Sequence, residues 1–236
     1  MEKNTKEKDT MTFDESKHPR DNDGKFTDKA SGEKSLRDYQ MKYGLEDGRL
    51  KYYRNRMEKA TSENIEHLVS TASPQHFVKA LTFAKETIDE RARWRVDTLT
   101  EEEYNNVKLF VTDKNSCVAI ALDGNIISLC KGKADDTVKG KQLLKYAVDN
   151  GGDRLDAFSG LYDFYARNGF EPVSWVEFDE NYAPEGWKPE YAKEPVIFWK
   201  YTGKGTMLTC EEFLKNVAPS KDYDTAKSIR DKEIDE

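Results

Sequence analysis

A run of short apolar segments in the middle of the chain constrains the fold most. "KLFVTD" (108–113) is followed by "SCVAIALDGNIISLCK" (116–131), where two apolar segments flank the dipeptide Asp123-Gly124. An Asp-Gly dipeptide between two such segments is typical of a tight β-hairpin. The sequence therefore predicts three consecutive antiparallel strands near the centre of the chain.

Segments with helical periodicity alternate with strand-like segments on both sides of this hairpin. Ser73-Pro74 is a helix start signal, and apolar residues recur at helical spacing from there to about residue 90. After the hairpin, the pattern predicts a helix that ends at Asn150-Gly151-Gly152. A strand, a helix and two more strands follow, up to residue 202. This order predicts the α+β class, with a mixed, mostly antiparallel sheet flanked by helices.

The two ends of the chain differ in composition from this body. Residues 1–34 hold eight Lys or Arg and nine Asp or Glu but few apolar side chains, which predicts a disordered charged tail. The basic, tyrosine-bearing segment 35–72 predicts a helical arm, which either packs on the body or docks an acidic partner or RNA. Residues 73–203 form the predicted main domain, and 204–236 a C-terminal helical extension.

Composition excludes several classes of protein. The 236 residues carry a formal net charge of −7, which argues against a general binder of nucleic acid or of an anionic membrane. No apolar run approaches the roughly 20 residues that span a bilayer, and the N-terminus has no secretory signal. The three cysteines are widely spaced, so we expect buried thiols in a reducing cytoplasm and neither disulfides nor a metal site.

One strand-to-helix junction has the features of a phosphate site. The strand "ISLCKG" leads through a polar loop into "DDTVKGKQLLKYAVDNGG" (135–152), whose helix contains Gly140 near its start. The first turn of a helix offers unpaired N–H groups and the positive end of the dipole. Gly140 permits close backbone approach, while Lys139 and Lys141 add positive charge. The residues alone leave open whether this is a phosphate site or an ordinary junction.

A tyrosine-rich helix is the second candidate for chemistry. In "LYDFYARNGF" (161–170), Tyr162 and Tyr165 lie three residues apart and share a helix face. A tyrosine hydroxyl, with a pKa near 10, either packs with its ring or donates a proton. The stretch by itself leaves both roles open.

Taken together, residues 73–203 resemble the GNAT acyltransferase superfamily. The order of elements is similar, "FYARNGFEPV" resembles the late helix–strand signature of that family, and 135–152 resembles its coenzyme A loop and helix. Where the family loop usually begins with Gln or Arg and ends with Gly or Ala, this chain has Thr137 and Gln142. Phrases such as "FYARNGFEPVSWVEFDENYAPEGW" are most similar to GNAT-like proteins encoded by phages and prophages.

The resemblance implies a sheet splayed between two strands, with acetyl-CoA as co-substrate in the splay. It implies that Tyr165 is the general acid that protonates the departing thiolate. It also implies two cofactor-binding segments, a strand that pairs with the pantetheine amides and a loop that holds the pyrophosphate through backbone N–H groups: Leu129, Cys130 and Lys131, then Val138, Lys139, Gly140 and Lys141. For the base that accepts the proton of the acceptor amine, Glu177 and Asp156 are the candidates.

Three functions are compatible with these observations. The first is an N-acetyltransferase in the cytoplasm of a phage-infected bacterium, whose acceptor amine belongs to a host protein or a small molecule. The aromatic loop 181–191 would line or cover its site. The second is a catalytically inactive GNAT-fold phage protein that binds and inhibits a host defence or transcription factor. The third is a virion-associated module with the tail as its attachment segment.

Overall fold

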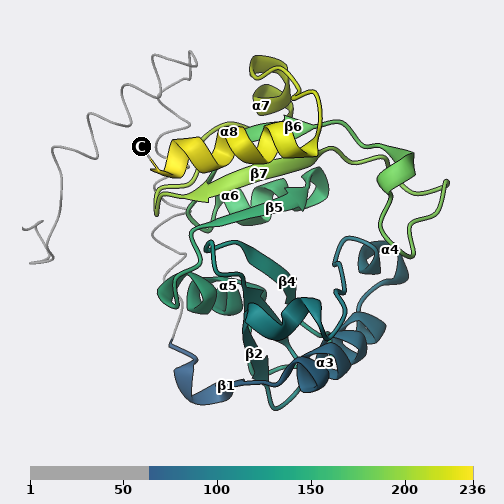
Figure 1. The fold of residues 1–236 in the computed structure, drawn as a ribbon, viewed down its shortest axis with the longest axis vertical. Coiled ribbons are helices and arrows are strands. Elements are labelled where there is room, and N and C mark those ends of the chain that lie inside the picture. Colours follow the sequence, from purple (N-terminus) through teal and green to yellow (C-terminus); the bar gives the residue numbers. More distant parts are fainter. Residues whose placement is uncertain (1–63, 236) are drawn as a thin grey trace, which may run out of the picture. The chain divides into compact units, whose positions relative to one another are not determined.

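The computed structural model describes residues 64–235, which lie within one compact unit of the chain, residues 52–236. These residues form two antiparallel sheets flanked by helices (Figure 1), which confirms the predicted α+β class. The predictions for residues 1–34 and for the greater part of 35–72 lie outside the described residues.

The first sheet contains the predicted hairpin. Its strands lie in the order β1-β2-β3-β4 and are all antiparallel. They are β1 (Val69–Thr71), β2 (Lys108–Thr112), β3 (Cys117–Ile120) and β4 (Ile126–Cys130). Gly124 has φ +84 in the turn between β3 and β4, a conformation that strongly favours glycine. The sequence prediction of three central strands is therefore confirmed.

Strand β1 occupies the end of the segment for which we expected a helical arm. The structure has a short 3-10 turn, η2 (Glu66–Leu68), and then β1, which pairs with residues 110–112 of β2. A three-residue strand is too short to show a period in the sequence, and its pairing with a distant strand decides its conformation. The sheet thus begins before residue 73.

Successive side chains of each strand point to opposite faces of this sheet, and one helix covers each face. Helix α3 (Pro74–Thr87) begins at Ser73, whose side chain accepts a hydrogen bond from the backbone N–H of His76. Its apolar face packs with alternate residues of β2. On the other face, the ring of Phe110 lies 5.2 Å from that of Tyr146 in α5 (Gly140–Asp149). Helix α4 (Glu90–Arg93) and the 3-10 turn η3 (Glu103–Asn106) lead from α3 back to β2.

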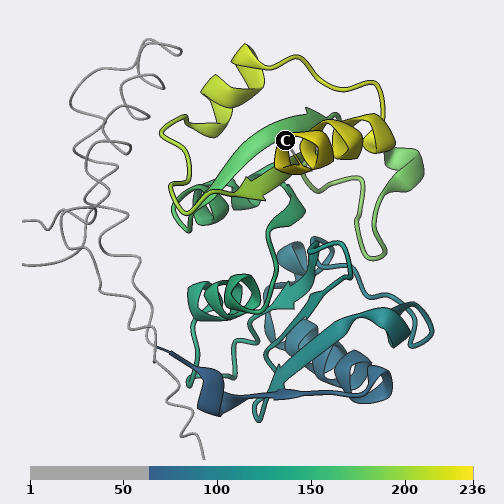
Figure 2. The same cartoon turned by 60° about the vertical axis from the view of Figure 1, so that its left-hand side comes forward.

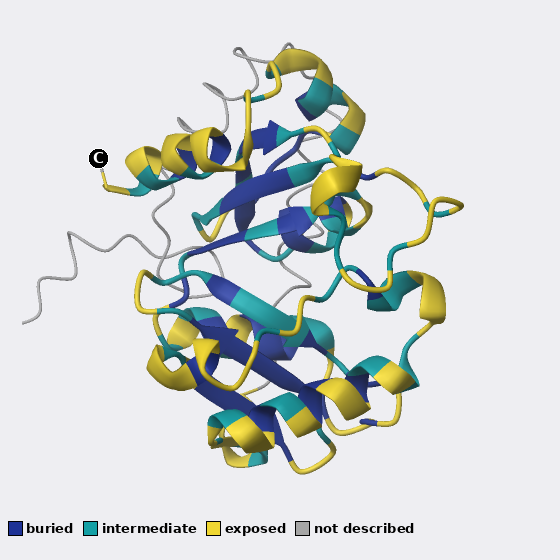
Figure 3. Ribbon diagram, turned by 45° about the vertical axis from the view of Figure 1, so that its right-hand side comes forward, coloured by how far each residue is buried: buried dark blue, intermediate teal, exposed yellow. Residues whose placement is uncertain are grey.

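The second sheet has the order β5-β7-β6 and is also antiparallel. In β7, Phe198 contacts Tyr223 of α8, whereas Trp199 contacts Tyr162 and Tyr165 of α6. The sheet is therefore covered on both faces, as the burial colouring in Figure 3 shows. The elements of this part are β5 (Arg154–Phe158), η4 (Ser159–Leu161), α6 (Tyr162–Ala166), β6 (Phe170–Val176), η5 (Glu180–Tyr182), β7 (Val196–Tyr201), α7 (Cys210–Asn216) and α8 (Tyr223–Asp235).

The two C-terminal helices belong to this fold. Helix α8 lies along the second sheet (Figure 2), and the hydroxyl of Ser174 in β6 donates to the carbonyl of Ala226 at 2.7 Å. The indole N–H of Trp175 donates to the carbonyl of Val217 at 2.7 Å. The segment 204–236, expected as a helical extension, thus supplies one covering layer of the second sheet.

The two sheets meet at a single parallel bridge. Asn125, next to the start of β4, pairs with Arg154 at the start of β5. No further ladder pair joins these strands within residues 64–235, so β4 and β5 run side by side at their beginnings and then separate. This is the splay between two strands that the sequence analysis expected, and it leaves an opening between the sheets.

Asp135 fixes the loop between β4 and α5, and we expect its loss to destabilise the fold. This fully buried carboxylate accepts hydrogen bonds from Thr112 Oγ1 at 2.6 Å and from the backbone N–H of Thr137 at 2.9 Å. Burial opposes its ionisation, but hydrogen bonds from Thr112, Thr137 and Ser116 outweigh burial and lower the pKa of Asp135 to about 2.

A carboxyl whose pKa is lowered in the folded state stabilises that state at pH values above its unfolded pKa of about 4. This contribution is lost as the pH falls towards about 2. Asp135→Asn should therefore lower the free energy of unfolding by about 2 kcal/mol at pH 7. It should also flatten the loss of stability between about pH 4 and 2. Urea unfolding at several pH values measures both, and a variant as stable as the parent at pH 7 would contradict the prediction.

Candidate functional site

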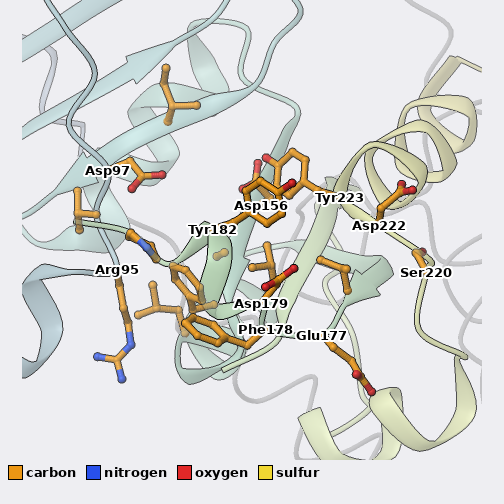
Figure 4. Close-up of a pocket in the computed structure, with 18 of the residues that line it drawn as sticks. Arg95, Asp97, Asp156, Glu177, Phe178, Asp179, Tyr182, Ser220, Asp222 and Tyr223 are labelled. Carbon is orange, nitrogen blue, oxygen red and sulfur yellow. The ribbon is translucent and has the colours of Figure 1, made fainter. Parts of the chain in front are cut away.

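A cavity of about 1510 Å³ occupies the opening between β4 and β5. Its wall is built from both strands, the end of β6 with the loop that follows, and residues 219–224 before and at the start of α8 (Figure 4). The cavity follows from the topology, because strands that share one bridge and then diverge leave the space between them unfilled by a ladder.

Tyr165 of α6 lies in the wall of this cavity. Its side chain is 7% exposed, and its ring lies 5.9 Å from that of Trp199 and 6.0 Å from that of Phe170. Among the described residues, no protein group hydrogen-bonds to its hydroxyl. Burial, and then the charge of Asp156, raise the pKa of Tyr165 far above its usual value. The hydroxyl therefore keeps its proton at neutral pH.

Tyr162, on the same face of α6, does not line the cavity. Its ring is 2% exposed and lies 4.9 Å from the ring of Trp199 and 6.2 Å from that of Phe213. The sequence leaves the roles of these two tyrosines open, and the structure separates their positions: one is a core ring and the other borders a cavity.

Asp156, in the middle of β5, lies in the same cavity as Tyr165. Its side chain is 24% exposed, and the Nη1 atom of Arg230 lies 4.0 Å from its carboxylate. Burial raises the pKa of Asp156, although Arg230 and hydrogen bonds with Tyr223 and Asn125 oppose the rise. A carboxyl with a raised pKa is a stronger base than one in water, which suits Asp156 to accepting a proton.

Glu177, the other candidate base, has a different position. It follows the last residue of β6, is exposed, and lies at the edge of the cavity. Figure 4 shows its side chain directed away from Asp156 and Tyr223. The structure brings Asp156 and Tyr165 to one cavity wall and leaves Glu177 at the rim.

Helix α8 contributes a site residue that the sequence analysis missed. Tyr223, in its first turn, shares a hydrogen bond with Asp156 and lines the cavity. Farther along α8, the fully buried Arg230 donates from Nη1 to the side-chain oxygen of Asn125 at 3.0 Å. No sequence signal links a polar helix at the end of the chain to a strand some 70 residues earlier, because the contact arises only when α8 packs on β7.

Strand β4 is irregular where it borders the cavity. Its pairing with β3 shifts between Cys117 and Ala119, and Ser128 has φ +51, a left-handed conformation uncommon for a residue with a Cβ. The Ser128 hydroxyl lies 2.7 Å from that of Tyr104 and donates to the carbonyl of Asp97 at 3.2 Å. This bulge interrupts the ladder at Ser128, so backbone groups there remain for a ligand.

Of the seven residues expected to bind the cofactor, only Leu129 lines the cavity. Cys130 is 2% exposed, and burial raises the pKa of its thiol to about 11, so it is an unreactive core residue. The remaining five lie beyond the end of β4 and at the start of α5, outside the cavity wall: Lys131, Val138, Lys139, Gly140 and Lys141.

The start of α5 offers fewer free N–H groups than the sequence analysis expected. The backbone N–H of Lys139 donates to Gln142 Oε1 at 2.8 Å, so this group is already satisfied. The N–H groups of Gly140 and Lys141 are in the first helical turn, where no intrahelical acceptor exists. The nearest atoms to a Cβ added at Gly140 would be those of Phe164 at 3.6 Å and Lys131 at 3.9 Å, which are ordinary contacts.

The first residues of the aromatic loop after β6 line the cavity. Asn181, Tyr182 and Pro184 line the cavity, and the Tyr182 side chain is 85% exposed. The loop is anchored at its far end by Glu194, which pairs with Arg95 and accepts from the backbone N–H of Gly160 at 3.0 Å. The expectation that this loop lines the site is therefore met in part.

Two classes of feature are absent from residues 64–235. No group of His, Cys, Asp and Glu side chains in that range is arranged to hold a metal ion. No helix in the same range is both long and apolar enough to cross a membrane.

Comparisons with known proteins find one structural likeness. No protein-family model matches the chain, and no curated protein matches it. A probable acetyltransferase of the GNAT family from Chromobacterium violaceum is similar in structure, with a TM-score of 0.36 and 11% sequence identity. The match covers 61% of this chain and 83% of that one.

Proposed function

We propose that this chain is an N-acetyltransferase that moves an acetyl group from acetyl-CoA to an amine by direct attack. The main support is a single arrangement: β4 and β5 separate after one bridge, and the opening holds the tyrosine hydroxyl of Tyr165 and the carboxyl of Asp156. This arrangement agrees with the splayed sheet and the tyrosine acid that the resemblance of residues 73–203 implies.

Two segments offer backbone groups that would suit acetyl-CoA, β4 in the cavity wall and the start of α5 outside it. The bulge at Ser128 leaves backbone groups of β4 unpaired, where the pantetheine amides would pair. Gly140 and Lys141 offer first-turn N–H groups for the pyrophosphate, with Lys131, Lys139 and Lys141 as nearby cations.

The proton balance of the transfer assigns the two cavity residues. Acetyl transfer forms a C–N bond and breaks a C–S bond, so the amine must lose a proton and the leaving sulfur must gain one. Asp156 takes the proton of the amine, since burial raises its pKa and Tyr223 fixes its orientation. Tyr165 donates the proton to sulfur, since its hydroxyl is protonated and has no protein acceptor among the described residues. Asp156 suits the role of base better than Glu177, which points away.

The first test is binding and turnover of acetyl-CoA with the full chain. We expect acetyl-CoA to bind with micromolar affinity in calorimetry, and coenzyme A to be released when a primary amine is added. A thiol reagent detects the released coenzyme A, and boiled protein is the control. Absence of binding up to millimolar acetyl-CoA would overturn the proposal.

A second candidate function is that of a GNAT-fold protein that binds a host factor without catalysis. One observation favours it: the N–H of Lys139 is satisfied within the protein, which removes one of the expected pyrophosphate donors. The same calorimetric experiment separates the two functions, because this candidate requires that acetyl-CoA does not bind.

A further inference from the structure

The cavity between β4 and β5 has a large excess of negative charge. Seven of its lining residues are Asp or Glu, and three are Lys or Arg. Each of the three cations already pairs with a carboxylate: Arg95 with Glu194, Lys193 with Glu180, and Lys221 with Asp222. A further cation, Arg230 of α8, lies 4.0 Å from Asp156. Four of the seven carboxylates therefore have no ion pair within the described residues.

Several of the cavity carboxylates have no ion pair within the described residues. Asp97, Asp179 and Asp224 belong to this group. Figure 4 shows Asp97 on the β4 side of the opening facing Asp156 on β5, with Asp179 below them. Burial raises the pKa of both Asp97 and Asp156, and each lies close enough to raise that of Tyr223 through its charge. Carboxylates that face one another across an opening are stabilised when a cation lies between them.

Two further features of the wall suit an ammonium ion. Tyr165 is 7% exposed and lines the cavity, and its hydroxyl has no hydrogen-bond partner among the described residues, so it can accept an N–H. The rings of Phe178 and Tyr182 also line the cavity, and aromatic faces attract cations. The wall thus offers acceptors and rings but no unpaired lysine or arginine within the described residues.

We infer that the acceptor is a polycationic amine, with one amino group beside Asp156 and Tyr165 and further ammonium groups against Asp97, Asp179 and Asp224. This inference rests on the proposed acetyltransferase function. A monoamine satisfies only the carboxylate next to the reacting carbon. An amine with several charges also satisfies the carboxylates of the loop after β6 and of the start of α8.

The test is a charge series of ligands, measured by calorimetry without acetyl-CoA. Butylamine, putrescine and spermidine carry one, two and three positive charges on similar alkyl chains. We expect spermidine to bind at least about tenfold more tightly than butylamine at low salt, with the difference shrinking in about 0.5 M NaCl because salt screens charges. Equal affinity across the series would overturn the inference.

A double variant locates the charge effect. Asp179→Asn with Asp224→Asn removes two cavity charges that have no ion pair within the described residues. The asparagine at position 179 keeps an oxygen that can accept the hydrogen bond from the backbone N–H of Asn181. We expect spermidine affinity to fall at least about fivefold and butylamine affinity to stay the same. Glu101→Gln, at an exposed position outside the cavity, is the matched control and should change neither. Unchanged spermidine binding in the double variant would contradict the inference.

Two further measurements identify the source of the amine and separate the proposals. Acetylation of spermidine assigns a free polyamine, whereas acetylation of tetralysine alone assigns the basic segment of a protein, and both support a polycationic acceptor. Faster acetylation of butylamine than of either would overturn it. Spermidine binding without any acetyl-CoA binding would reject the transferase and leave the cation site in place.

Discussion

Turnover is expected to fall about 100-fold or more when Tyr165 is replaced by phenylalanine, with acetyl-CoA affinity little changed. The substitution removes one oxygen from a ring that stays packed against Trp199 and Phe170. Because the hydroxyl has no protein partner among the described residues, its loss should change the free energy of unfolding by at most about 1 kcal/mol. The proton is needed only as the sulfur leaves, so the substitution should lower turnover without lowering the affinity for acetyl-CoA.

Tyr162→Phe is the matched control for this prediction. Its ring lies on the same face of α6 and also contacts Trp199, but it does not line the cavity. We expect this variant to turn over like the parent chain. Steady-state rates with saturating acetyl-CoA, together with calorimetry for affinity, measure both variants. Full activity in Tyr165→Phe would return this residue to the core and would favour the non-catalytic function.

The order of elements was predictable because it depends on local signals. The Asp123-Gly124 hairpin, the Ser73-Pro74 helix start and the Asn150-Gly151-Gly152 helix end are each read within a few residues, and the structure has each of them. The three-residue strand β1 was not predictable, because its conformation depends on pairing with β2. Local chemistry therefore predicts the class of the fold but not the limits of its sheets.

The candidate site was predictable only where the family resemblance supplied it. Tyr165 was singled out from the sequence, and it lies in the cavity wall. Tyr223 and Asp97 carry no pattern in the sequence, and they reach the cavity through the packing of α8 and the connection after α4. The sequence does not distinguish Asp156 from Glu177, because both lie in strand-like segments. The structure has Asp156 within β5 in the cavity wall and Glu177 exposed after the end of β6.

A carboxylate introduced at Gly140 is expected to separate cofactor binding from stability, because its two effects have opposite signs. Position 140 is the first residue of α5, where the helix dipole favours a negative charge by about 0.3–1 kcal/mol. The nearest atoms to a Cβ there belong to Phe164 at 3.6 Å and Lys131 at 3.9 Å, which are ordinary contacts, so a Cβ fits without a clash. Gly140→Asp should therefore fold at least as stably as the parent, while its charge repels a pyrophosphate held at the same helix start.

We expect coenzyme A affinity to fall about 100-fold or more in Gly140→Asp, since like charges about 4 Å apart near a protein surface repel by several kcal/mol. Gly140→Ala should give a smaller loss of affinity from crowding alone. Gly186→Asp adds the same charge in an exposed loop with nothing within 4 Å of its Cβ. The φ of +86 at this position strains an aspartate, so the variant should lose some stability, but its coenzyme A affinity should be unchanged. Calorimetry measures affinity and thermal unfolding measures stability. Parent-like coenzyme A affinity in Gly140→Asp would show that the start of α5 does not bind the pyrophosphate. This conclusion would hold whatever the result of the Tyr165→Phe experiment.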